Sequence, residues 1–124
     1  MKNKLMTLAA ILMVTASAFA QDSPLWLRKN SISPDGEQIA FTYKGNIYIV
    51  DSDGGQARQI TSNPAYDTDP LWSPDGRAII FASYREKSKD IYRIPASGGT
   101  PVRLTSHPGN ETPMTVLEDG NIIF

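Results

Sequence analysis

Short apolar runs separated by turn-forming residues dominate the chain. In the segment 38–43, Ile39, Phe41 and Tyr43 alternate with smaller or more polar residues, a two-residue period that is typical of a β-strand with two distinct faces. The segment 47–50 is β-branched or aromatic throughout, which fits a strand covered on both faces. Beyond the N-terminal segment no stretch of ten residues shows helical periodicity, so the pattern predicts an all-β fold.

The apolar runs recur with the same turns between them. The turn Ser33-Pro34-Asp35-Gly36 returns at residues 73–76 and, in a degraded form, at residues 117–120. Pro34 fixes φ at the first corner, Asp35 can accept a local backbone hydrogen bond, and Gly36 can take the positive φ that closes the turn. Three further markers recur after 44 residues (47 to 91, for example): Ile47-Tyr48 at 91–92, Gly54-Gly55 at 98–99, and Ile60-Thr61-Ser62 at 104–106.

The spacing of these markers assigns four short strands to each repeat. The proline turn recurs after 40 residues (33 to 73) and the later markers after 44. The second repeat therefore carries four extra residues, which lie within 84–89 between its second and third strands. Repeats of this kind are typical of four-stranded sheets arranged radially in a β-propeller. A β-sandwich or a β-solenoid is a less favoured alternative, because neither accounts for the four-strand period with its recurring turn.

We therefore expect a β-propeller of four-stranded antiparallel blades over residues 30–124. Blade 1 is expected at about 30–62, blade 2 at about 67–106, and blade 3 from about 112, with the chain ending in its second strand at Phe124. A propeller closes with about four to eight blades, so about two and a half blades form an incomplete one. The remaining blades of a longer parent chain are expected partners of this segment.

The N-terminal segment has the three-part layout of a secretory signal peptide. Lys2 and Lys4 precede an apolar run at 5–14, and Ala18-Phe19-Ala20 is a small-x-small cleavage site. The apolar run is too short for a comfortable membrane span. We expect residues 1–20 to be cleaved and residues 21–29 to lead into the propeller. The mature chain is then periplasmic or secreted, without a membrane span; an uncleaved anchor or a buried N-terminal helix is the alternative.

Charge and composition narrow the class of partner. The chain has 12 basic side chains, 13 acidic side chains and no cysteine. Loss of Lys2 and Lys4 with the signal peptide leaves a net charge of about −3 and no basic stripe, which argues against nucleic-acid binding. Peptides or proteins are the expected partners. Without cysteine no disulfide bond can cross-link the fold, so its stability must come from apolar burial.

No residue of the chain is predicted to be catalytic. A serine nucleophile needs a base and an oxyanion site, and the only histidine, His107, occupies the repeat position of Asn63. A position that the repeat fills with asparagine as readily is expected to be a loop residue. Ser52 and Ser97 adjoin paired glycines and are assigned to turns, and no Gly-x-Ser-x-Gly motif is present.

No metal or cofactor site is predicted. Zinc would need a cluster of cysteines or histidines. Asp51 and Asp53 are expected at the opposite end of a strand pair from Asp67 and Asp69, so these carboxylates should not converge on a calcium ion. Because no glycine-rich loop precedes a helix, nucleotide binding has no support in the sequence.

The segment Arg85–Lys89 is the one feature beyond the generic repeat. In a four-stranded blade, the loop between the second and third strands shares a rim with the connection to the next blade. The insertion should therefore neighbour residues 62–67 and 106–111. A basic loop there could contact an acidic ligand or a peptide carboxylate, although a solvated hairpin tip is favoured. Packing is likewise the favoured role for three large aromatic side chains that could line a binding surface: Trp26, Tyr66 and Trp72.

These repeats resemble the TolB-type propeller repeat, whose signature is a Ser-Pro-Asp-Gly turn, an apolar strand, an Ile-Tyr strand and a Gly-Gly turn before Leu-Thr. The resemblance covers residues 31–124. A narrower similarity, to the N-terminal propeller of bacterial tricorn-like serine proteases, rests on residues 24–28, 32–36, 39–48, 64–67 and 70–74. It implies further β-structure, a PDZ domain and a tail-specific-protease catalytic domain in the parent protein, whose propeller would gate peptide access.

The leading hypothesis is that the chain is the N-terminal propeller portion of an exported tricorn-like serine protease. The segment itself would have no peptidase activity and would take part in peptide access or protein binding. One alternative is a non-enzymatic TolB-like periplasmic binding module. Another is the propeller of a different exported hydrolase, in which a Gly-x-Ser-x-Gly motif or a histidine cluster would follow.

Cleavage after Ala20 can be tested directly. When the chain is expressed with its own N-terminus in a bacterial host, N-terminal sequencing of the exported protein should begin at Gln21, because small residues at 18 and 20 fit the peptidase site. The substitution Ala18→Arg should abolish cleavage of the signal peptide, whereas Asn3→Gln should leave cleavage unchanged. An unprocessed wild-type chain would contradict the signal-peptide interpretation.

Overall fold

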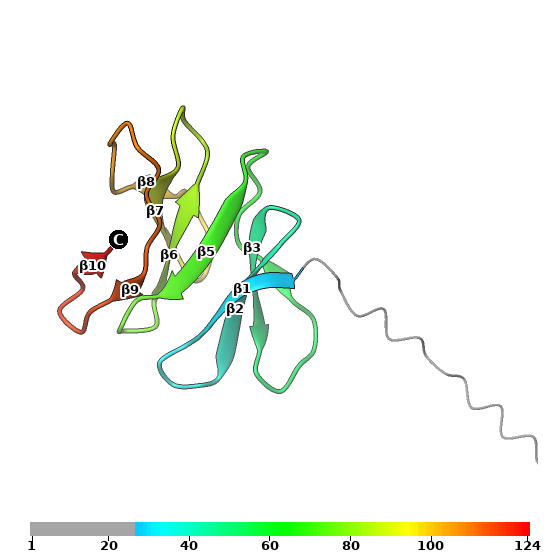
Figure 1. The fold of residues 1–124 in the computed structure, drawn as a ribbon. Helices are drawn as coiled ribbons and strands as arrows, with labels where there is room; N and C mark the ends of the chain where they lie inside the picture. Colours follow the sequence, from blue (N-terminus) through cyan, green and yellow to red (C-terminus); the bar gives the residue numbers. More distant parts are fainter. Residues whose placement is uncertain (1–26) are drawn as a thin grey trace, which may run out of the picture.

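The structure, a computed structural model, describes residues 27–124 (Figure 1). The predicted signal peptide at 1–20, the lead-in up to residue 26 and Trp26 lie outside the described residues. The described part contains ten β-strands and no helix. They are β1 (Leu27–Ile32), β2 (Gln38–Tyr43), β3 (Asn46–Asp51), β4 (Arg58–Gln59), β5 (Asp67–Trp72), β6 (Ala78–Ser83), β7 (Asp90–Pro95), β8 (Val102–Arg103), β9 (Thr115–Val116) and β10 (Ile122–Ile123).

The strands form two four-stranded sheets and the start of a third. The sheet orders are β1-β2-β3-β4 and β5-β6-β7-β8, and β9 pairs with β10. All of these pairings are antiparallel. Figure 1 shows the two complete sheets side by side, with β9 and β10 beyond the second. The prediction of an all-β, open propeller fragment is confirmed, and we refer to the two sheets as blade 1 and blade 2.

Each Ser-Pro-Asp-Gly turn is held by a local hydrogen-bond network. The Ser33 hydroxyl donates to Asp35 Oδ1 over 2.5 Å and accepts from the Gln38 N–H over 2.9 Å. The Glu37 N–H donates to Asp35 Oδ1 over 3.0 Å, and Gly36 has a φ of 76°. Residues 73–78 repeat these contacts with the same partners in sequence order. The turn motif is therefore explained by contacts within six residues.

The same hydrogen bonds lower the pKa of two carboxyl groups. The Ser33 hydroxyl, followed by the Glu37 N–H, favours the charged form of Asp35 and holds its pKa below the usual value. Ser73 and then the Arg77 N–H do the same for Asp75. Because the folded-state pKa lies below the unfolded-state value, each turn stabilises the fold above the unfolded-state pKa. This contribution is lost as the pH falls through the folded-state pKa.

The hairpin at the other end differs between the blades, as predicted. In blade 1, Tyr43 pairs with Asn46, and the two residues between them form a tight turn with φ of 48° at Lys44 and 78° at Gly45. Positive φ at both positions is the mark of a type I′ hairpin. In blade 2 the corresponding pair is Ser83 and Asp90, joined by residues 84–89. The four extra residues therefore lengthen one hairpin loop and leave the strand register unchanged.

The innermost strands contain bulges that the sequence pattern did not reveal. We expected the first strand to begin at Asn30, but β1 begins at Leu27 and is interrupted at Lys29. The φ of Lys29 is 50°, and Asp69, at the matching position of β5, has a φ of 54°. Each bulge breaks the alternation of side chains, so pattern analysis could not extend the strand. Lys29 Nζ lies 3.6 Å from Asp69 Oδ1, which joins the two bulges across the blades.

From the sequence pattern we expect outer strands at 57–61 and 102–105, but β4 and β8 are shorter. Beyond these strands the N–H groups of Ile60 and Leu104 still donate to the carbonyls of Ile47 and Ile91, and a side-chain hydrogen bond is added. The Thr61 hydroxyl accepts a hydrogen bond from the Ile47 N–H over 2.9 Å, and Thr105 does the same for Ile91. A hydroxyl therefore takes the place of a ladder carbonyl, which gives the recurring threonine a structural role.

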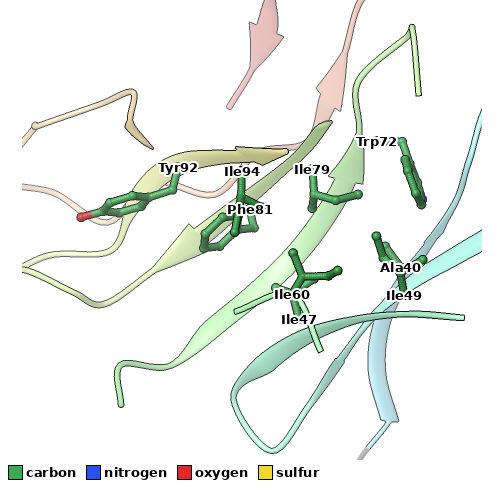
Figure 2. Close-up of a cluster of buried hydrophobic side chains, with 9 residues drawn as sticks. All are labelled: Ala40, Ile47, Ile49, Ile60, Trp72, Ile79, Phe81, Tyr92 and Ile94. Atoms are coloured by element: carbon green, nitrogen blue, oxygen red, sulfur yellow. The ribbon is translucent and has the colours of Figure 1, made fainter. Parts of the chain in front are cut away.

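The hydrophobic core lies between blade 1 and blade 2. Figure 2 shows side chains of the two sheets facing one another across this interface. Blade 1 contributes Ala40, Ile47, Ile49 and the following Ile60, and blade 2 contributes Trp72, Ile79, Phe81, Tyr92 and Ile94. The Trp72 indole N–H also donates to the Ser31 carbonyl over 3.0 Å. Trp72 is therefore a packing residue, as favoured from the sequence.

Two repeat-related phenylalanines allow a matched test of this interface. Phe81 is completely buried between the blades, whereas Phe41 on the outer face of blade 1 is half-buried. Phe81→Ala should lower the free energy of unfolding by about 3–5 kcal/mol, and Phe41→Ala should cost clearly less. Denaturant unfolding of both variants measures the difference; equal losses would contradict the assignment of the core.

Candidate functional site

The outer face of blade 1 forms an open apolar groove. The groove has a volume of about 480 Å³ and is lined by side chains of β1, β2 and β3. Its apolar lining includes Leu27, Ile39, Phe41, Tyr48 and Val50. The Phe41 and Tyr48 rings stack with their centroids 5.8 Å apart. A contiguous apolar patch of this kind marks an interaction surface in a folded protein.

Blade 2 shows what this groove is suited to contact. Phe81 and Tyr92, the repeat partners of Phe41 and Tyr48, stack in the same way at 5.9 Å. In blade 2 this face packs against the Ala40, Ile47 and Ile49 face of blade 1. The groove is therefore the blade 1 counterpart of the blade 2 face that packs against a neighbouring sheet.

The second candidate surface is the end of the sheets that carries the inserted loop, called here the upper rim. It consists of the turn 44–45 and the segments 61–66, 84–89 and 104–111, which lie at the upper end of the sheets in Figure 1. The inserted loop contacts both blade connections. The Tyr84 N–H donates to the Tyr66 carbonyl over 3.2 Å, and the Glu111 N–H donates to the Lys89 carbonyl over 2.7 Å. The predicted neighbours of the insertion are confirmed.

Arg85 of the inserted loop is bound within the protein. Its Nη2 lies 3.0 Å from Asp67 Oδ2, and its Nε donates to Ser83 Oγ over 3.1 Å. The guanidinium also stands 5.6 Å from the centre of the Phe81 ring and 5.3 Å from that of Tyr92. Asp67 is fully buried, and the Arg85 side chain is 15% exposed. Arg85 therefore closes the upper end of the interface between the blades and is not available to a ligand.

A second buried carboxylate, Asp90, is held in the same way. Arg103 Nη2 lies 2.7 Å from Asp90 Oδ2, and the Ser88 hydroxyl lies 3.4 Å from both carboxylate oxygens. Ser88 also donates to the His107 carbonyl over 3.1 Å. Nearby, burial raises the pKa of the Tyr92 hydroxyl. Both ion pairs lie within blade 2 and fix the position of the inserted loop.

His107 has the geometry of a loop residue. Its Nδ1 accepts a hydrogen bond from the Gly109 N–H over 3.0 Å. Asn63, its repeat partner, accepts from the Ala65 N–H over 2.8 Å with its side-chain oxygen. The two side chains therefore cap equivalent turns, which explains why the repeat accepts either residue. The described contacts of His107 include no serine side chain aligned as a nucleophile.

The opposite end of the sheets, called here the lower rim, is acidic. Its turns carry seven carboxylates and one arginine, Arg77: the carboxylates are Asp35, Glu37, Asp51, Asp53, Asp75, Glu118 and Asp119. Asp67 begins β5 at the upper end, and Asp69 pairs with Lys29, so neither approaches Asp51 or Asp53. Among residues 27–124 no group of three or more acidic or histidine side chains could hold a metal ion. Over the same residues no helix is long and apolar enough to cross a membrane.

Nearly all of the described chain matches one known protein family. That family is described as the tricorn protease N-terminal beta propeller domain, and it matches residues 24–124. The chain belongs to this family. A solved structure of the tricorn protease superposes with a TM-score of 0.66 at 25% identity, over 78% of this chain and 10% of that one. Membership of a propeller family agrees with the four-stranded antiparallel sheets described above.

Two curated relatives match parts of this chain. Tricorn protease homolog 1 of Streptomyces coelicolor is 32% identical over 72 residues, which cover 58% of this chain and 7% of the relative. The Tol-Pal system protein TolB of Bordetella pertussis is 48% identical over 54 residues, covering 43% of this chain and 12% of the relative. The chain spans about a third or less of the first curated relatives that it matches.

Sequence reasoning did not foresee the two buried ion pairs. A signal was present, because the repeat partners of Asp67 and Asp90 in blade 1 are Leu27 and Asn46. A carboxylate that appears in one repeat only, at a position expected inside a sheet, requires a local partner. The partners themselves, in the inserted loop and in β8, could be assigned only from the packed structure.

Removal of Arg85 should destabilise the fold. Arg85→Ala leaves Asp67 buried without its cation, so the free energy of unfolding should fall by about 3 kcal/mol or more. Lys87→Ala, in the same loop but exposed, should change it by no more than about 0.5 kcal/mol. Denaturant unfolding compares the two variants; similar values would show that Arg85 does not seal the interface.

Proposed function

We propose that the chain is the N-terminal β-propeller portion of an exported tricorn-like serine protease. The observation that carries this proposal is the match of the tricorn N-terminal propeller family to residues 24–124. The small share of the tricorn homologue that the chain covers, 7%, supports a role as one part of a larger protein. The catalytic serine and its partners would then lie in other parts of that protein.

The open groove of blade 1 supports the same proposal. It is the repeat partner of the blade 2 face that packs on blade 1, so we infer that it packs against another blade of the parent propeller. The occupant would offer small and branched apolar side chains, like those of Ala40, Ile47 and Ile49. The closed ring would act in peptide access to the protease or in protein binding, after export by the signal peptide at 1–20.

A non-enzymatic binding module of the TolB type is the second candidate. It is favoured by the 48% identity to TolB of Bordetella pertussis over 54 residues. A solved TolB of Acinetobacter baumannii also superposes with a TM-score of 0.63 at 38% identity. Such a module would be periplasmic and would bind other envelope proteins without any catalytic domain.

The reading frame of the source DNA distinguishes the two candidates. Beyond the codon for Phe124 we expect further Ser-Pro-Asp-Gly repeats, followed by a PDZ region and a protease region. Purified residues 21–124 should not hydrolyse peptides, because their described part aligns no serine with a base. A frame that closes the propeller and then stops would favour the TolB-type module, and peptide hydrolysis by residues 21–124 would contradict both candidates.

A further inference from the structure

Tyrosines and lysines of both blades lie along the upper rim. The Tyr66 ring lies against the blade 1 hairpin, since a Cβ at Gly45 would stand 3.0 Å from Tyr66 Cδ2. The Tyr66 carbonyl accepts the Tyr84 N–H over 3.2 Å, and Lys89 Nζ stands 5.9 Å from the centre of the Tyr84 ring. At the blade 1 hairpin, Lys44 Nζ stands 5.3 Å from the centre of the Tyr43 ring, and Lys87 is exposed in the inserted loop. We define the tyrosine–lysine strip as Lys44, Tyr66, Tyr84, Lys87 and Lys89.

The strip presents its functional groups to solvent. Tyr66 is 48% exposed and Tyr84 is 45% exposed, although both are anchored by the backbone contact between their loops. Among residues 27–124 three ion pairs are formed, and they involve Lys29, Arg85 and Arg103. The lysines of the strip are therefore not neutralised within the described part of the chain. Exposed tyrosine rings are enriched at surfaces that bind a protein partner, and the lysines add positive charge beside them.

The positive charges of the strip are lysines. Arginine forks bind carboxylates and phosphates bidentately, and on this rim Arg85 and Arg103 are already held by Asp67 and Asp90. What remains are lysine point charges and tyrosine rings. These suit a flexible chain that carries separated negative charges and apolar groups. Glu86 and Glu111 also lie on this rim, but neither is within 4.0 Å of a strip lysine in the described structure.

The two ends of the sheets differ in charge. The turns of the lower rim carry seven carboxylates and Arg77, and Arg58 and Arg93 also lie near this end. The lower rim therefore keeps an excess of negative charge, which repels an acidic partner and favours its approach to the opposite end. Exposed charges act over about 10 Å at 0.1 M salt, and complementary potentials mainly set orientation and the rate of association. The two rims therefore distinguish the faces of the propeller by charge.

We propose that the tyrosine–lysine strip binds acidic segments of peptides or proteins. This inference rests on the proposed role in peptide access or protein binding and names the class of partner. Lys44 and Lys89 would attract the carboxylates from either side of the blade boundary, and the rings of Tyr66 and Tyr84 would pack against the segment between them. Exposed ion pairs contribute about 0.2–1 kcal/mol each, so specificity for charge would come from several contacts together.

Fluorescence anisotropy with the full-length chain tests the proposal. The probes are a short labelled peptide that alternates Glu and Ala and a matched peptide with Gln for every Glu. The acidic peptide should bind more tightly, and the double variant Lys44→Gln/Lys89→Gln should weaken its binding about tenfold at low salt. Tyr84→Ser should weaken both peptides. Lys89→Gln alone should also weaken binding, whereas Arg77→Gln, which removes one positive charge from the lower rim, should not.

Four outcomes would overturn the inference. They are equal binding of the two peptides, no binding of the acidic peptide, equal effects of the strip and Arg77 variants, and binding of phosphatidylglycerol vesicles in place of the acidic peptide. Thermal unfolding of each variant verifies its fold, since exposed substitutions should shift stability by no more than about 0.5 kcal/mol. Failure of the proposed function is seen separately in the reading frame: a frame without a protease leaves the measured peptide binding valid.

Discussion

Face-to-face packing of neighbouring sheets is the constraint on which the rest of this structure depends. Each blade is apolar on both faces, so it is stable only when another blade covers it. The contact between blade 1 and blade 2 buries Ile47, Ile79, Phe81 and Ile94 completely. Burial of a large apolar side chain contributes about 1.5–3 kcal/mol. Because the chain has no cysteine, its stability depends on these contacts and not on the disulfide bonds that stabilise many small secreted domains.

The repeat maintains this packing by fixing the ends of the strands. Ser33 and Asp35 close one end of blade 1, and the Thr61 hydroxyl holds the outer strand to Ile47. Equivalent contacts at Ser73 and Thr105 give blade 2 the same register. Because these hydrogen bonds lie within one blade, each blade acquires the same two faces independently. One face of each blade can then pack against the other face of the next.

The inserted loop in blade 2 shows how one repeat can acquire a separate role. Four added residues bring Arg85 onto Asp67 and over the Phe81 and Tyr92 rings, which closes the upper end of the interface. The same loop places Tyr84 beside Tyr66 at the surface. A stabilising contact and an exposed aromatic surface therefore arise from a single insertion. Loops placed on a rigid scaffold are the usual location of binding residues in repeat folds.

The sequence alone determined the repeat, the all-β class, the turns and the position of the insertion. Those features depend on contacts within a few residues, such as the Asp35 turn, or on a strict period of two. The tertiary structure decided the bulge at Lys29, the pairing of Asp67 with Arg85 and the exposure of the Phe41 face. A bulge breaks the period that pattern analysis requires. An ion pair or a covered face depends on which segments pack together, and packing between sheets joins residues that are distant in sequence.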